Sequence, residues 1–325
     1  MSERGADGGG AETPTRRWHR YILAPTLLLV AVALAALPFV VASMVAEFRG
    51  GQAALYDLRG GRPIGPGETV NPGGREFLNV AVVDLNEATG SLTLAISGNR
   101  SCNPCASPKQ MTFFALDADV GQRRGITPFA TVTVPAGQTT YSQRVTLPVR
   151  GSPIRYPFDT YQVRLGLDLP PPESQPAGGP TNNQVLGTLE SQLTRFVMDA
   201  PVLVASASPT TQTSPTPGLV LDLAFHRPVY LPALATLLVV FVAVSSALAL
   251  ATQPIDGLLL GLGGLILAIW GVRSVLVPSW LEAITAVDLA LSGVILLLLV
   301  GVAVRAALHL HRRAGLHLPR LRRRT

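Results

Sequence analysis

The stretch VYLPALATLLVVFVAVSSALALA, residues 229–251, decides the architecture of this chain. It holds no charged side chain, and an α-helix of about 20 apolar residues is long enough to cross the hydrocarbon core of a bilayer. Backbone groups in lipid must be paired within their own segment, so the stretch is predicted to be a transmembrane helix. The composition agrees, because charged residues make up only 14% of the chain, against about 25% in an average soluble domain.

Three further apolar runs are predicted to span the membrane: residues 21–46, 257–277 and 284–304. The first run follows a basic segment and is longer than the roughly 7–15 apolar residues of a cleaved signal peptide. We therefore predict an uncleaved signal anchor, and cleavage after this run is the alternative.

Arginines mark both ends of the chain as cytoplasmic. Residues 1–20 contain four arginines, and residues 305–325 contain seven arginines and no acid. Positively charged flanks stay on the cytoplasmic side, so we predict a multi-pass protein of the cytoplasmic membrane with residues 47–228 outside. The basic C-terminal tail is predicted to lie against anionic lipid headgroups. The use of arginine in place of lysine is typical of a GC-rich bacterial genome.

The outside segment, residues 47–228, has the patterns of β structure. Residues 91–97 alternate between apolar and small or polar side chains, the period of a half-buried strand. The candidate strands are residues 76–85, 91–97, 111–116, 129–134, 139–149, 161–169, 186–196, 201–205 and 219–225. Turn residues separate them, which predicts an extracytoplasmic antiparallel β-sandwich between one N-terminal and three C-terminal transmembrane helices, an α+β membrane protein.

A polar insert interrupts this segment near its end. Residues 206–217 are Ser, Thr or Pro at ten of twelve positions. Such a composition is too polar to bury a core, so it predicts a flexible linker before the final strand. O-glycosylation outside the cell is the functional alternative.

The outside segment has few residues suited to catalysis. Its 14 basic and 14 acidic side chains balance, so it lacks the basic face of a nucleic-acid-binding module. Its one histidine, His226, lies at the predicted membrane boundary. A nucleophilic triad would therefore lack a histidine base, and a histidine metal site would lack ligands. The scattered acids are predicted to lie on a solvated surface, and a glycosidase-like carboxylate pair is the enzyme alternative. We expect no enzymatic activity, no cofactor and no nucleic-acid partner.

Cys102 and Cys105 are the only cysteines. They lie in a predicted loop between strands, without the following helix that lowers the thiol pKa in thioredoxin-like C-x-x-C motifs. Outside the cytoplasm, a small disulfide that locks the loop is the predicted role. Redox activity and free thiols are the alternatives.

Two charges lie inside the predicted spans. At about 1.5 Å per residue, Arg273 and Asp288 both stand roughly 25 Å above the cytoplasmic edge of their helices. Charges in a membrane are usually paired or functional, so we predict a structural ion pair between them. Glu282 is an alternative partner for Arg273, and an ion or proton path is the functional alternative.

A distinctive hexapeptide, YPFDTY, starts at Tyr156. Pro157 favours an extended entry to a strand, and Asp159 is expected to bond nearby backbone amides in a turn. Phe158 and Tyr161 are expected to bury their rings at the edge of the sandwich. The motif is therefore predicted to anchor a strand corner.

With this motif and its arrangement of spans, the chain resembles the domain of unknown function 4436 family of bacterial and fungal multi-pass membrane proteins. The resemblance implies the architecture, and it implies no catalytic residues. The motif is also similar to a strand corner of pentameric ligand-gated channels, but this chain has an N-terminal span and only three spans after the sandwich.

These patterns favour an integral membrane protein that presents a β-sandwich outside the membrane as a non-enzymatic binding or scaffold module. Its expected partners are the lipid bilayer and an envelope protein or glycan. The alternative is a channel- or transporter-like subunit that is gated by the extracytoplasmic domain.

Overall fold

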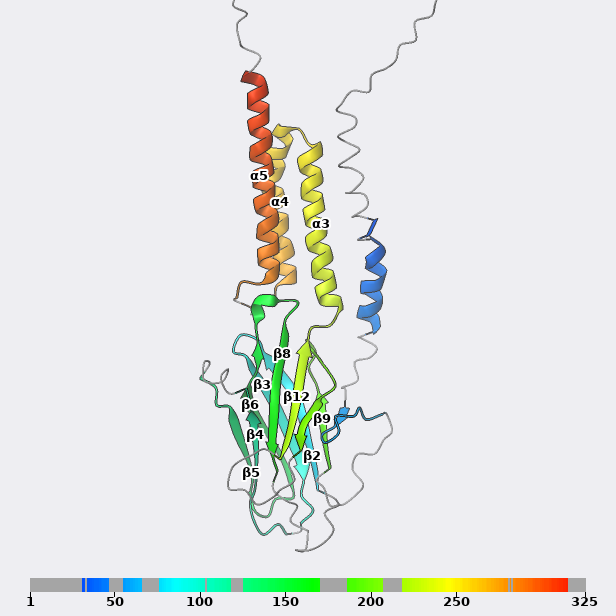
Figure 1. Ribbon diagram of the computed structural model, residues 1–325, viewed down its shortest axis with the longest axis vertical. Helices are drawn as coiled ribbons and strands as arrows, with labels where there is room; N and C mark the ends of the chain where they lie inside the picture. Colours follow the sequence, from blue (N-terminus) through cyan, green and yellow to red (C-terminus); the bar gives the residue numbers. More distant parts are fainter. Residues whose placement is uncertain are drawn as a thin grey trace, which may run out of the picture. The chain divides into compact units, whose positions relative to one another are not determined.

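The computed structural model describes residues 31–32, 34–46, 55–65, 76–102, 104–117, 125–169, 186–206, 218–279, 281 and 283–314. The chain divides into two compact units, shown in Figure 1, which we describe separately. The β unit comprises Val45–Pro232 and Ser279–Ala286, and the helical unit comprises Met1–Met44, Ala233–Pro278 and Val287–Thr325. The structure is thus of the α+β class.

The β unit contains two sheets. Five strands form the first sheet in the order β1-β9-β2-β3-β6, and the second has the order β10-β12-β8-β4-β5, with β11 beside β12 and β7 beside β8. The strands are β1 (Leu55–Asp57), β2 (Phe77–Asn86), β3 (Ser91–Asn99), β4 (Lys109–Ala115), β5 (Phe129–Val134), β6 (Thr140–Pro148), β7 (Arg150–Gly151), β8 (Thr160–Asp168), β9 (Leu186–Ser191), β10 (Val197–Met198), β11 (Val202–Ser206) and β12 (Leu219–His226). A single 3₁₀ turn, η1 (Pro153–Arg155), follows β7.

One strand pair differs from the expected antiparallel arrangement. β2 and β9 run parallel, with Asn79 opposite Thr188, whereas the other paired strands that the structure describes run antiparallel. The prediction of a purely antiparallel β structure is therefore wrong at this pair. A parallel pair needs a long crossover, and the chain from β3 to β8 supplies it.

Both sheets contribute to one hydrophobic core. The inward-facing positions of β3 and β8 are Leu92, Leu94, Ile96, Val163, Leu165 and Leu167, and all are at most 2% exposed. Full burial of such a side chain contributes roughly 1.5–3 kcal/mol. The period-two pattern of residues 91–97 therefore identified the core face of β3.

Most strand predictions hold within two residues, and that for 129–134 matches β5 at both ends. The predicted strand 186–196 is too long, because β9 ends at Ser191 and the chain then leaves the first sheet. The backbone N–H of Gln192, directly after β9, donates to Val82 at 2.9 Å. The sequence did not predict β1, β7, β10 or the turn η1.

The helical unit contains α3 (Tyr230–Thr252), α4 (Ile255–Leu276) and α5 (Ala286–Ala314). Among the residues that the structure describes, two helices are long and apolar enough to cross a membrane, Tyr230–Thr252 and Ala286–His311. Leu34–Ala46 and Gly261–Leu276 are shorter apolar helices. Both long helices are mostly uncovered by the protein. In the most apolar stretch of each, only 22% of the residues of Tyr230–Thr252 and 28% of those of Ala286–His311 are buried. α5 continues ten residues beyond the predicted span 284–304, so part of the predicted C-terminal tail is helical.

A small residue allows α5 to approach α3 closely. A Cβ atom at Gly301 would lie only 2.3 Å from a methyl carbon of Leu250. Next to this contact, the guanidinium of Arg305 donates a hydrogen bond to the backbone carbonyl of Leu250. Leu298 and Val302 are buried in the same cluster.

The glycine of β7 generates a testable prediction. A Cβ atom at Gly151 would lie 2.1 Å from the ring of Tyr161, which is fully buried and has no room to move. We expect Gly151→Ala to destabilise the β unit by about 1–3 kcal/mol, the usual effect of overpacking. Thermal unfolding of the full chain in detergent measures this loss.

Gly218→Ala is the matched control, because its new methyl group would be 3.8 Å from its nearest neighbour, the carbonyl of Leu167. Equal melting temperatures for the two variants would show that the ring of Tyr161 tolerates a methyl group at position 151.

Candidate functional site

A buried ion cluster connects the two sheets. The Nε atom of Arg227 donates to Asp159 at 3.1 Å, and its Nη2 atom donates to the same carboxylate at 3.0 Å. The Nη2 atom also lies 2.8 Å from Oε1 of Glu87. The three side chains are at most 3% exposed. One guanidinium thus binds two carboxylates out of contact with solvent.

Each of these three residues lies next to the end of a strand, and the pairing of the strands brings them together. Arg227 directly follows β12, Asp159 directly precedes β8, and Glu87 directly follows β2. β12 and β8 are antiparallel and pair His226 with Thr160, so Arg227 and Asp159 meet at the same end of the second sheet. Glu87 comes from the first sheet, and the cluster therefore joins the two sheets.

Aromatic rings surround the guanidinium. The Cζ atom of Arg227 lies 4.0 Å from the ring centroid of Phe196 and 4.9 Å from that of Tyr156. The ring of Phe196 meets Tyr161 edge to face at 5.4 Å. Such cation–π contacts stabilise a desolvated cation by up to about 2 kcal/mol.

The surroundings fix the protonation states of the cluster. Burial lowers the pKa of Arg227, but its hydrogen bonds with Asp159 and the charges of Asp159 and Glu87 outweigh burial and raise it. Burial, followed by the charge of Asp159, raises the pKa of Tyr161, and burial also raises the pKa of Tyr156. Arg227 therefore stays charged and both tyrosines stay neutral at neutral pH. The cluster is suited to holding strands and exposes no group to a substrate.

The structure corrects two expectations for the YPFDTY motif. Tyr156 and Tyr161 are buried, but Phe158 is 57% exposed. The backbone N–H of Phe158 donates to Arg155 at 2.7 Å, which closes a tight turn and directs the ring of Phe158 outwards. Asp159 bonds the side chain of Arg227 instead of nearby backbone amides. The Tyr156–Pro157 peptide bond is cis.

The sequence analysis missed Arg227 and Glu87. Arg227 and Asp159 are 68 residues apart in the chain. No sequence motif links residues at this separation, so the contact could not be predicted. The expectation that the acids lie on a solvated surface is wrong for Glu76, Glu87 and Asp159, which are all buried. A weak signal existed, because Arg227 lies directly between an apolar strand and an apolar helix.

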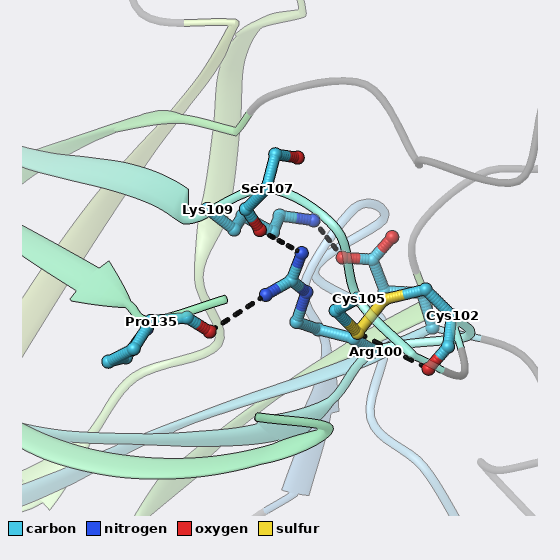
Figure 2. Close-up of a disulfide and its surroundings, with 7 residues drawn as sticks. Arg100, Cys102, Cys105, Ser107, Lys109 and Pro135 are labelled. Carbon is cyan, nitrogen blue, oxygen red and sulfur yellow. Dashed lines mark hydrogen bonds and ion pairs between the residues drawn. A yellow bond between two sulfur atoms is a disulfide. The ribbon is translucent and has the colours of Figure 1, made fainter. Parts of the chain in front are cut away.

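A second cluster of polar contacts surrounds the cysteines (Figure 2). Cys102 and Cys105 form a disulfide. Beside it, the guanidinium of buried Arg100 donates to the carbonyls of Ser107 at 2.7 Å and Pro135 at 3.2 Å. A buried ion pair joins Lys109 to Glu76. The disulfide loop is therefore tied to its neighbours by buried cations.

The structure also brings the predicted intramembrane charges together. The Nε atom of Arg273 donates a hydrogen bond to Oδ1 of Asp288. The guanidinium also lies 5.7 Å from the ring centroid of Trp270. Glu282, the alternative partner, lies outside the described residues.

Other candidate sites are small. In the part of the chain that the structure describes, no group of three or more His, Cys, Asp or Glu side chains is placed to hold a metal ion. A cavity of about 100 Å³ is lined by residues of 83–85 and 192–196, including Arg195 and Phe196. Pockets for small molecules usually measure about 300–1,000 Å³.

Part of the β unit is similar to a known family. Residues 70–211 match the family model described as Domain of unknown function (DUF4436). The match confirms the similarity to this family that was inferred from the sequence, and the matched residues include the strands from β2 to β11. No curated protein matched the chain.

The ion cluster generates the second prediction. We expect Arg227→Met to destabilise the β unit by about 3–5 kcal/mol, because it leaves the buried carboxylate of Asp159 without its counter-charge and Glu87 with the more distant Arg195, at 3.8 Å. Denaturant unfolding of the full chain measures the loss. Adding Asp159→Asn and Glu87→Gln to the same chain should recover part of it, because these changes remove the buried negative charges that Arg227 neutralised.

Arg164→Met is the control. Arg164 forms an ion pair with Asp222 at 2.8 Å, but both side chains are more than 40% exposed. Exposed pairs contribute little because water screens them. A loss for Arg227→Met no larger than that for Arg164→Met would contradict a structural role for the cluster.

Proposed function

We propose that this chain is a multi-pass protein of the cytoplasmic membrane that presents its β unit, as a β-sandwich, outside the membrane. It acts there as a non-enzymatic binding or scaffold module of the cell envelope. The observation that carries the proposal is the exposure of large apolar side chains on the helices. Examples are Phe241 on α3, Trp270 on α4 and Leu297 on α5, which are 55%, 62% and 73% exposed.

Lipid explains this exposure better than water does. Each large apolar side chain gains roughly 1.5–3 kcal/mol when it leaves water, and a bilayer supplies that gain to side chains that the protein leaves uncovered. The proposed spans are residues 21–46, 229–251, 257–277 and 284–304. Their arginine-rich flanks support cytoplasmic termini and an outside position for residues 47–228.

Two observations support a binding role over a catalytic one. The buried group of charges around Arg227 is closed to solvent, and its members bind one another. By contrast, β11 exposes Val202 and Val204 by 61% and 49%, and β12 is the strand paired with it among the described residues. An open sheet edge can bind an extended partner segment by strand addition.

Cysteine accessibility tests the topology. We expect Thr146→Cys, on the exposed face of β6, to react with a membrane-impermeant maleimide in spheroplasts. His311→Cys, near the end of α5, should react only after the membrane is permeabilised. Both native cysteines are in a disulfide, so each variant carries one thiol. Protection of Thr146→Cys in spheroplasts would refute the proposed topology.

Photo-crosslinking tests the binding role. A photoreactive amino acid at Val202 is expected to give a discrete covalent adduct in cells, because this edge strand is open to a partner. The same group at Thr146, on a polar exposed face, is the control and should give none. Identical adduct patterns at the two positions would argue against a specific partner at β11.

The Arg273–Asp288 pair favours one alternative function, a channel or transporter gated by the β unit. Charges within spans often line ion pathways. This function requires ion flux in liposomes that contain the purified chain, and the flux must fall when Arg273 and Asp288 are both replaced by Leu. Absence of flux in the unaltered chain leaves the pair with a structural role.

A further inference from the structure

We propose that the β7–β8 turn, residues 152–159, inserts into the outer headgroup region of the membrane that the helices of the same chain cross. The inference rests on the proposed function and adds to it a second attachment to lipid, made by the β unit itself. The occupant is the lipid surface, and neither a second copy nor a protein partner is required.

The chemistry of the turn fits a membrane interface. Ile154 and Phe158 are 56% and 57% exposed, and Arg155 between them is also exposed. Segments that lie at the lipid interface combine large apolar side chains, which enter the acyl region, with Lys or Arg, which stays among the headgroups. Three neighbouring residues supply this combination here.

The ion cluster holds the turn next to the start of α3. Asp159, adjacent to Phe158, is bonded to Arg227, which precedes Tyr230 by three residues. An extended chain covers at most about 3.6 Å per residue, so Arg227 is within about 11 Å of the first residue of α3.

Other apolar side chains of the β unit lie where the chain enters helices. Val229, directly before α3, is 58% exposed, and Ile284, two residues before α5, is 67% exposed. Ile284 belongs to the segment Ser279–Ala286, which groups with the β unit. Two connections to apolar helices thus carry exposed aliphatic side chains, as expected for chain that passes through the headgroup region.

The turn is also rigid enough to present its side chains without a large ordering cost. Pro153 begins η1, Pro157 follows it, and the hydrogen bond from Phe158 to Arg155 closes the loop. Groups that are ordered before binding lose less conformational entropy on contact. The apolar tips of Ile154 and Phe158 are therefore already in place for lipid.

Spin labelling of the full chain tests the inference. Nitroxide labels are placed on Phe158→Cys, Phe129→Cys and Leu297→Cys, and each variant is reconstituted in liposomes of phosphatidylcholine and phosphatidylglycerol. Phe129 is the matched control, because it is a 53% exposed phenylalanine of the same unit. Phe129 pairs with Phe114 on β4, and Phe114 is opposite Gly166 on β8. Gly166 is six residues along β8 from Thr160, where the turn ends. Phe129 is therefore paired to a part of β8 that lies about 20 Å along the strand from the turn.

Collision rates with oxygen, which concentrates in lipid, and with a water-soluble nickel chelate report the depth of each label. We expect the label at position 158 to lie about 5–10 Å into the boundary between headgroups and acyl chains. The label at 129 should be aqueous, and the label at 297, on α5, should be deep in lipid.

The other outcomes overturn the inference in distinguishable ways. An aqueous label at 158 with a deep label at 297 refutes insertion of the turn and leaves the membrane assignment intact. A label at 158 that is shielded from both reagents shows that protein covers the turn, and it also refutes the inference. An aqueous label at 297 refutes the proposed function and the inference together.

Discussion

The side chain of Arg227 neutralises two carboxylates that come from different sheets, and the arrangement of the β unit depends on this contact. Desolvation of each ion costs several kcal/mol, so the three charges can be buried only when all of them are present in the right geometry. Glu87 fixes the end of β2, and Asp159 fixes the start of β8 and the turn before it. Arg227 itself begins the connection to α3.

The position of the cluster, at one end of both sheets, determines how rigid that end of the β unit is. Arg227 is only 5% exposed, yet its side chain connects the five-stranded sheet to the seven-stranded sheet. Its backbone leads into the connection to α3. A movement of either sheet at this end would separate a buried ion pair. The cluster therefore makes this end of the β unit stiff.

The sequence was informative wherever a feature depended on local pattern. Alternation indicated the strand at residues 91–97, apolar runs indicated α3, α4 and α5, and a predicted loop outside the cytoplasm suggested that Cys102 and Cys105 pair. The sequence was uninformative for β1, β7 and β10, because two or three residues are too few to show a period. The Arg227 cluster and the outward position of Phe158 depend on tertiary contacts and turn direction, which no single segment encodes.

The parallel pairing of β2 and β9 has a consequence for biogenesis. Thr188 donates a hydrogen bond to Asn79 at 2.8 Å across 109 residues of chain. As the polypeptide emerges from its N-terminal side, β2 and β3 can form a hairpin at once, but the other flank of β2 must wait for β9. During that interval the nascent hairpin offers unpaired amide and carbonyl groups to neighbouring chains, a known route to aggregation.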